Sequence, residues 1–232
     1  MDDKISSNSP SRYVVITGDL KSSRKLKERA KIQENFKNAL KTVNKKFKGT
    51  ITAEFIITGG DSFQGMLPSL YHIFDIYYEL FVNIGYPFYL GVGVGGISTK
   101  LSNNVGEMDG EAFHRSAEAL ERVKKDKAWI GFRSGWDIDD IVTSSWNLMA
   151  DVIWNWSKRQ KEIIMYYRNH GENREAVKSA AKRFGVGERS IYKTLRIGKY
   201  HLLKAVENSL KEILNQKWFN SNIEPEKGDR RR

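Results

Sequence analysis

The chain has 232 residues, 40% of them hydrophobic, which is enough to bury a core in one or two domains. It has no cysteine, so disulfides and thiolate metal sites are excluded, and no apolar run approaches the length of a membrane span. The net charge is +11, and residues 157–232 hold 19 of the 39 Lys and Arg residues but only 9 of the 28 Asp and Glu residues.

The basic C-terminal third favours an acidic partner, with nucleic acid ahead of an anionic membrane surface. A solvated basic helical surface would explain the same charge without any partner. The N-terminus, MDDKISSNSPSR, has no apolar signal core, so we expect a cytoplasmic protein that does not contact a membrane.

The first elements are a strand and a long helix. Residues 1–11 are polar, and we expect them to form a disordered lead. Residues 13–16 form a β-branched run that ends in Thr-Gly-Asp, which is typical of a buried strand. Apolar residues then recur at three- and four-residue steps over about residues 22–47, with lysines between them, which predicts an amphipathic helix.

A hairpin is predicted from FIITGGDSFQG, residues 55–65. Two glycines permit backbone angles that other residues resist, so strands over 51–58 and 62–67 can turn sharply between them. The elements expected next are a helix from Pro68 through Phe81, a glycine-thinned strand over 88–97, a helix that begins near Asp109 and a strand over 129–132.

The order β-α-β-β-α-β followed by α-β predicts a ferredoxin-like sheet with an added helix and strand, covered by helices on one face. This domain would span residues 12–135. Beyond it we expect a tryptophan-rich connector helix over 136–156, an all-α domain over 157–216 and a basic tail over 217–232. The helices expected in the all-α domain cover residues 157–169, 173–184, 188–197 and 199–216.

Asp19 and Asp61 are the candidate metal ligands. Asp19 ends the first strand and Asp61 lies in the hairpin expected beside it, so both carboxylates would lie at one edge of the sheet. Two close carboxylates repel unless a cation lies between them, and Mg²⁺ (or Mn²⁺) commonly takes one or two carboxylates, water and phosphate oxygens. Each aspartate alone is also typical of an ordinary turn, but the pair favours a metal site.

The connection after the first strand favours binding of a triphosphate, ATP or GTP. A short turn there enters a helix, so free backbone N–H groups, hydroxyls and cations face one point. The residues expected to contact the nucleotide are Gly18, Leu20, Lys21, Ser22, Ser23 and Arg24, with Gly59 and Gly60 of the hairpin.

Four blocks, ITGDLKSSRKL, FIITGGDSFQGML, FYLGVGVGGISTKL and DGEAFHRSAEALERVKK, resemble in that order the SatD family of bacterial proteins. They are also similar to the palm-type catalytic core of class III nucleotidyl cyclases and GGDEF diguanylate cyclases. The resemblance covers roughly residues 12–127. It implies that Asp19 and Asp61 hold metal ions that activate a 3′-hydroxyl and steady the triphosphate, and that residues 18–23 form the phosphate loop.

One position departs from that pattern. Ser62 stands where diguanylate cyclases carry a glutamate needed for catalysis, so diguanylate cyclase activity is not expected. Class III cyclases tolerate a small residue there, which leaves nucleotide cyclisation open. The sequence has no clear equivalent of their other catalytic side chains; the resemblance makes Lys100 and Arg115 candidates for contact with the nucleotide, although either could be a surface charge.

Residues 175–199 carry the spacing of a helix-turn-helix. A small residue, Ala181, falls where two helices would cross, Gly185 falls at the turn, and Ile191 would anchor the second helix. This resembles bacterial regulators and the C-terminal region of sigma factors. The residues expected to contact DNA are Lys182, Arg183, Arg189, Ser190, Tyr192, Lys193, Arg196 and Lys199. The alternative is a basic bundle that binds a protein or only closes the first domain.

Together these features predict a nucleotide-responsive transcriptional regulator in which nucleotide and Mg²⁺ bias the presentation of the basic helices. We expect a homodimer, because helix-turn-helix proteins usually bind paired half-sites. Two alternatives stay open. One is a metal-dependent nucleotidyl cyclase or nucleotidyltransferase with Asp19 and Asp61 as catalytic residues, and the other is a catalytically inert dimerisation scaffold.

Overall fold

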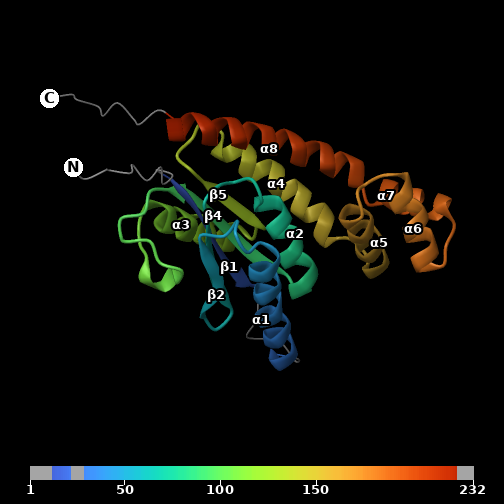
Figure 1. The fold of residues 1–232 in the computed structure, drawn as a ribbon, viewed down its shortest axis with the longest axis horizontal. Coiled ribbons are helices and arrows are strands. Elements are labelled where there is room, and N and C mark those ends of the chain that lie inside the picture. Colours follow the sequence, from blue (N-terminus) through green and yellow to red (C-terminus); the bar gives the residue numbers. More distant parts are fainter. Residues whose placement is uncertain (1–11, 22–28, 224–232) are drawn as a thin grey trace, which may run out of the picture. The chain divides into compact units, whose positions relative to one another are not determined.

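The computed structural model describes residues 12–21 and 29–223 (Figure 1). The expected lead (1–11), the candidate residues Ser22, Ser23 and Arg24, and the end of the expected tail (224–232) lie outside the described residues. The chain divides into two compact units, one within residues 1–143 and 211–232 and the other within 144–210.

The first unit is built on a five-stranded sheet with the order β2-β3-β1-β4-β5. Its strands are β1 (Tyr13–Leu20), β2 (Ala53–Gly59), β3 (Ser62–Leu67), β4 (Phe88–Gly95) and β5 (Ile130–Arg133). The first four strands pair antiparallel, and β5 is added parallel to β4. This is the ferredoxin-like order that the element sequence predicts, extended by one strand at the β4 edge.

Helices cover both faces of this sheet, not one face as the sequence led us to expect. On one face lie α1 (Arg29–Lys46) and α2 (Ile73–Ile84), where Phe36 packs against Phe63 with ring centres 5.6 Å apart and Tyr77 packs against Phe88 with ring centres 5.9 Å apart. The opposite face carries α3 (Glu111–Asp126).

The glycines of β4 explain why α3 packs on that face. A Cβ atom at Gly91 would lie 2.2 Å from the carbonyl oxygen of Ser116, and one at Gly93 would lie 2.2 Å from that of Ala112. Only a strand without side chains at these positions lets a helix backbone lie directly on it. The close neighbour expected from the glycine pattern is therefore a helix backbone.

The helix after β3 begins later than predicted. Residues up to His72 form a turn, with the Ile73 amide donating to the Leu70 carbonyl at 3.2 Å, and α2 starts at Ile73. Between β4 and α3 a short 3₁₀ turn, η2 (Val105–Glu107), interrupts the predicted loop.

The second unit is helical. Its helices are α5 (Lys158–Asn169), α6 (Arg174–Phe184) and α7 (Glu188–Ile197), with most of α4 (Asp139–Trp154) and the first part of α8 (Tyr200–Ile223). Ile164, Ala180, Ile191 and Leu195 form the centre of its core. α5 and α6 begin where the sequence offers N-cap residues, because Ser157 forms a capping box at the start of α5 and Asn173 caps the start of α6.

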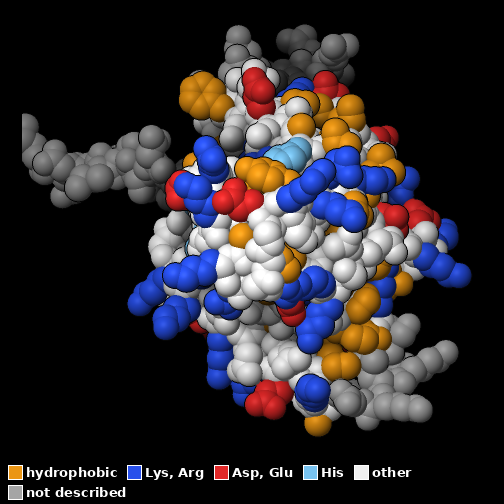
Figure 2. Space-filling view, turned by 90° about the vertical axis from the view of Figure 1, so that its right-hand side faces the viewer, with side chains coloured by type: hydrophobic (Ala, Val, Ile, Leu, Met, Phe, Trp, Pro, Cys, Tyr) orange, Lys and Arg blue, Asp and Glu red, His pale blue; other side chains and the backbone are white. Residues whose placement is uncertain are grey.

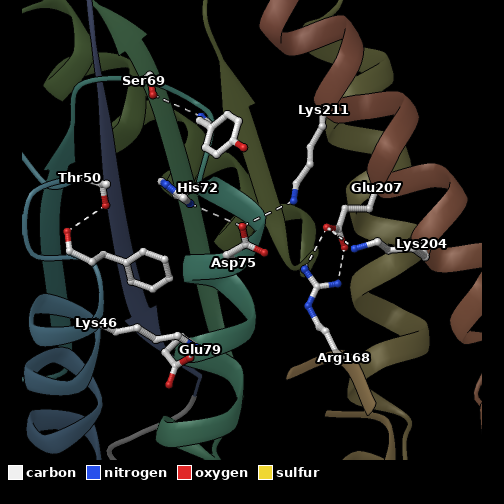
Figure 3. A network of polar contacts seen from close by, with 12 residues as sticks. Lys46, Thr50, Ser69, His72, Asp75, Glu79, Arg168, Lys204, Glu207 and Lys211 are labelled. Atoms are coloured by element: carbon white, nitrogen blue, oxygen red, sulfur yellow. Dashed lines mark hydrogen bonds and ion pairs between the residues drawn. The ribbon is translucent and has the colours of Figure 1, made fainter. Parts of the chain in front are cut away.

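Within the second unit a buried ion pair joins α5 to α8 (Figure 3). The guanidinium of Arg168 donates to both carboxylate oxygens of Glu207, at 2.8 and 2.9 Å, and the Glu207 side chain is fully buried. Lys204 lies 3.8 Å from the same carboxylate and bonds Glu172 at 3.0 Å. The charges of this pair are thus matched inside the unit.

α8 continues to Ile223, beyond the predicted helix end at residue 216, because neither glycine nor proline interrupts residues 199–223. None of the helices in the described ranges is both long and apolar enough to cross a bilayer.

Candidate functional site

The hairpin brings the two candidate aspartates to one edge of the sheet. β1 and β3 pair with Asp19 opposite Ser62, the residue after Asp61. The Leu20 amide donates to the Asp61 carbonyl at 3.1 Å, so the backbones that carry the two aspartates are hydrogen-bonded neighbours. Gly60 adopts a left-handed conformation, with φ 55°, which closes the turn before Asp61.

The carboxylate of Asp19 is held on both of its oxygens. The Ser62 hydroxyl donates to Oδ1 at 2.7 Å, and the Lys124 ammonium lies 2.5 Å from Oδ2. The Asp19 side chain is 15% exposed, whereas that of Lys124 is 40% exposed. A half-buried carboxylate at the sheet edge is therefore neutralised by a lysine from the last turn of α3.

The oxygen-only donor set at this edge suits a hard cation that keeps most of its water. Among the described residues, no three His, Asp or Glu side chains gather into a closed metal centre. Asp19 and Asp61 fit the Mg²⁺ pattern of one or two carboxylates completed by water and phosphate oxygens. A cation bound to Oδ2 of Asp19 would take the place of the Lys124 ammonium.

The described residues of the expected phosphate loop make packing contacts and backbone hydrogen bonds within the fold. A Cβ atom at Gly18 would lie 2.1 Å from the Phe63 ring, so this glycine makes room for a buried aromatic side chain. The backbone amide of Leu20 is used by Asp61, and that of Lys21 donates to the Pro87 carbonyl at 2.8 Å. These two N–H groups, which we expected to face a phosphate, are already hydrogen-bonded.

The Lys21 side chain lies on two aromatic rings. Its Nζ is 3.3 Å from the centre of a Trp129 ring and 4.4 Å from the centre of the Tyr89 ring, and it donates to the Ala128 carbonyl at 3.1 Å. Gly59 and Gly60 behave differently, because no atom of the described residues would lie within 4 Å of a Cβ atom at either position. The described part of the chain therefore does not crowd the two glycines that precede Asp61.

The structure does not bring Arg115 and Lys100 to this edge. Arg115 donates to the Val94 carbonyl at 2.6 Å, whereas Asp19 pairs with Tyr89, five residues earlier on the same strand. At the rise of a strand this separation is about 17 Å. Lys100 is exposed in the loop that follows the Val94 end of β4.

Lys124, Tyr89 and Trp129 are the residues at this edge that the sequence reasoning missed. No local motif marks them. They approach Asp19 and Lys21 only because α3 runs back along β4 and β5 pairs with it.

The candidate DNA-contacting residues all lie exposed on α6, on α7 or just after it. Ala181 and Ile191 are buried between these helices, and Gly185 ends α6 in a left-handed conformation, with φ 64°. A hollow of about 800 Å³ is lined by Gly187, Arg189, Ser190, Tyr192, Lys193 and Arg196. Figure 2 shows Lys and Arg side chains spread over one face of the molecule, among hydrophobic and a few acidic side chains.

The fold and the two neighbouring aspartates define an α+β protein with a ferredoxin-like sheet and a candidate cation site at its edge. The chain belongs to the SatD family, whose model matches residues 13–202. Comparison with the curated proteins finds no match.

Two similar solved structures are nucleotide cyclases. One is a bacterial light-regulated adenylyl cyclase, with 11% identity over 53% of this chain and 75% of that chain and a TM-score of 0.40. The other is the guanylate cyclase domain of RhGC from Catenaria anguillulae in complex with GTP, with 10% identity over 48% of this chain and 72% of that chain and a TM-score of 0.35. These similarities are too distant to carry an argument about function.

Proposed function

We propose that the N-terminal unit binds ATP or GTP together with Mg²⁺ or Mn²⁺ at Asp19 and Asp61, as a nucleotide-binding unit of the nucleotidyl cyclase type. One observation carries the proposal. The pairing of β1 with β3 brings the backbones of these two aspartates together, and the described residues do not crowd the two glycines before Asp61. Paired carboxylates suit a cation that arrives with phosphate oxygens.

Asp19 and Asp61 would hold the cation, and the Ser62 hydroxyl orients the Asp19 carboxylate. When bound, the cation would polarise the triphosphate and activate a 3′-hydroxyl. Lys124, which otherwise neutralises Asp19, would be released toward the phosphates.

The experiment is a titration of the purified full chain with ATP and GTP, with and without Mg²⁺, followed by calorimetry and by pyrophosphate release. We expect Mg²⁺-dependent binding that Asp61→Asn abolishes. Asp151→Asn, which removes the same charge from an exposed position in the second unit, is the matched control. Wild-type protein that binds neither nucleotide would refute the proposal and leave the inert scaffold.

Turnover distinguishes the two forms of the proposal. Pyrophosphate release that is lost in Asp61→Asn would make the unit a nucleotidyl cyclase or nucleotidyltransferase. Binding without release would make it a nucleotide sensor, as the regulator hypothesis requires.

A second candidate function is DNA binding by α6 and α7. It is favoured by the basic exposed side of α7, where Arg189, Lys193 and Arg196 line the hollow while Ile191 and Leu195 on the opposite side are buried. An arginine-rich helix side suits base edges and phosphates. A homodimer would present two such helices to paired half-sites, which light scattering of the purified protein tests.

The DNA proposal is tested by fluorescence anisotropy with duplex DNA at several salt concentrations. We expect binding that weakens as salt rises and is lost in the Arg189→Ala, Lys193→Ala, Arg196→Ala triple variant. A control triple variant removes three exposed basic residues from the start of α5 and from α6: Lys158→Ala, Arg174→Ala and Lys178→Ala. Equal affinity in both triple variants would contradict the assignment of α7.

A further inference from the structure

The rings of Tyr89 and Trp129 border a small space, here called the aromatic seat, in which the Lys21 ammonium lies. The Lys21 ammonium lies 3.3 Å from the centre of a Trp129 ring and 4.4 Å from that of the Tyr89 ring, so both rings present a face or edge to the same small space. All three side chains are half-buried, which leaves the seat accessible from solvent. The contact is a cation–π interaction, and a lysine makes it through a flexible four-carbon stem.

The seat lies beside the candidate cation site. Tyr89 is the partner of Asp19 across the β1–β4 pairing, and Trp129 comes next to it because its carbonyl accepts from the Leu90 amide at 2.9 Å. Successive strand residues alternate between faces, so Asp19, Lys21 and Tyr89 project to the same side of the sheet. This is the side on which α3 places Lys124.

A ring face that attracts an ammonium also stacks a planar heterocycle. Once a triphosphate lies at Asp19, the Lys21 ammonium would meet a stronger partner than the two rings and the neutral Ala128 carbonyl, because phosphate oxygens carry full negative charge. We propose that Tyr89 and Trp129 stack the base of the bound nucleotide, and that Lys21 occupies their seat until the phosphates draw its ammonium away. This inference rests on the proposed nucleotide site.

The test compares ligands with and without a base. Mg²⁺·ATP and Mg²⁺·GTP are titrated against the full chain beside Mg²⁺·tripolyphosphate, which offers the same phosphates and no ring. Trp129→Leu and Tyr89→Leu should each weaken nucleotide binding roughly 5- to 150-fold, the range for loss of one base–aromatic stack, and leave tripolyphosphate affinity within about twofold. Trp129→Phe, which keeps a ring, should retain most of the nucleotide affinity.

The possible results distinguish the base-stacking proposal from the proposed nucleotide and cation site on which it rests. Unchanged nucleotide affinity in both leucine variants, or equal losses for nucleotide and tripolyphosphate, would overturn the base seat while the Asp61→Asn result still supports the cation site. Wild-type protein that binds tripolyphosphate and nucleotide equally well would also overturn it. Wild-type protein that binds neither ligand would overturn both proposals.

A fluorescence measurement covers the case in which a leucine variant fails to fold. Nucleotide should quench the emission of wild-type protein more than that of Trp129→Phe, because stacking on an indole quenches it. Equal quenching in the two proteins would count against the seat.

Discussion

Replacing Lys124 with methionine should strengthen cation binding at Asp19. In the structure the Lys124 ammonium lies 2.5 Å from a carboxylate oxygen that a metal ion would need, so the metal-free protein must give up this ion pair. With side-chain exposures of 40% for Lys124 and 15% for Asp19, such a partly exposed pair contributes about 1 kcal/mol. Removing it from the metal-free state should tighten Mn²⁺ binding about fivefold.

The assay is a Mn²⁺ titration followed by electron paramagnetic resonance in the absence of nucleotide, so that a lysine–phosphate contact cannot mask the effect. Lys125→Met removes the same charge from the neighbouring, exposed position of α3 and should change the affinity by less than about twofold. Asp19→Asn should lose binding altogether. Mn²⁺ affinity that is unchanged or lower in Lys124→Met would refute the idea that Lys124 and the cation compete for Asp19.

Three further predictions concern stability. Gly93→Ala should destabilise the first unit by about 3 kcal/mol or more in urea unfolding, because its Cβ atom would meet the backbone of α3 at 2.2 Å. Gly187→Ala has open space around its Cβ atom and should cost only about 1 kcal/mol, the loss expected for a poorer N-cap of α7. Glu207→Ala should cost about 3–5 kcal/mol, because it removes the buried carboxylate that the Arg168 guanidinium bonds with both of its oxygens. Arg168→Met combined with Glu207→Leu should recover most of this loss, and equal losses in the single and double variants would contradict the prediction. Burial lowers the pKa of Lys161 to about 8, so the unfolded chain binds more protons than the folded chain between pH 8 and the ordinary lysine pKa. The free energy of unfolding, relative to that of Lys161→Met, should therefore rise with pH across that window. Unfolding free energies of the two proteins that stay parallel across the window would contradict this.

The elements of the fold were predictable where the signal is local. β3 at Ser62–Leu67 and α7 at Glu188–Ile197 have the predicted bounds, because turn glycines and apolar spacing lie within the segments themselves. The start of α2 was misplaced, since Pro68 is also compatible with the turn that precedes Ile73. The glycines of β4 predict that another backbone or a ligand comes close, but only the tertiary structure shows that the neighbour is α3.

By itself the sequence determined that Asp19 lies at the end of a strand, one residue before the last residue of β1, and that Asp61 follows a glycine turn, because both facts depend on neighbouring residues. It also placed Ala181 where two helices cross, Gly185 at the turn and Ile191 as the anchor of the second helix. The burial of Ala181 and Ile191 and the left-handed conformation of Gly185 agree with that spacing. Short-range sterics and hydrophobic periodicity suffice for such statements.

Only the tertiary structure decided what surrounds Asp19. The direction of α3 along β4 places Lys124 on its carboxylate, and the pairing of β4 with β5 places Tyr89 and Trp129 around Lys21. It also carries Arg115 to the other end of the strand. These neighbours are far apart along the chain and are joined by packing, for which no local pattern provides a signal.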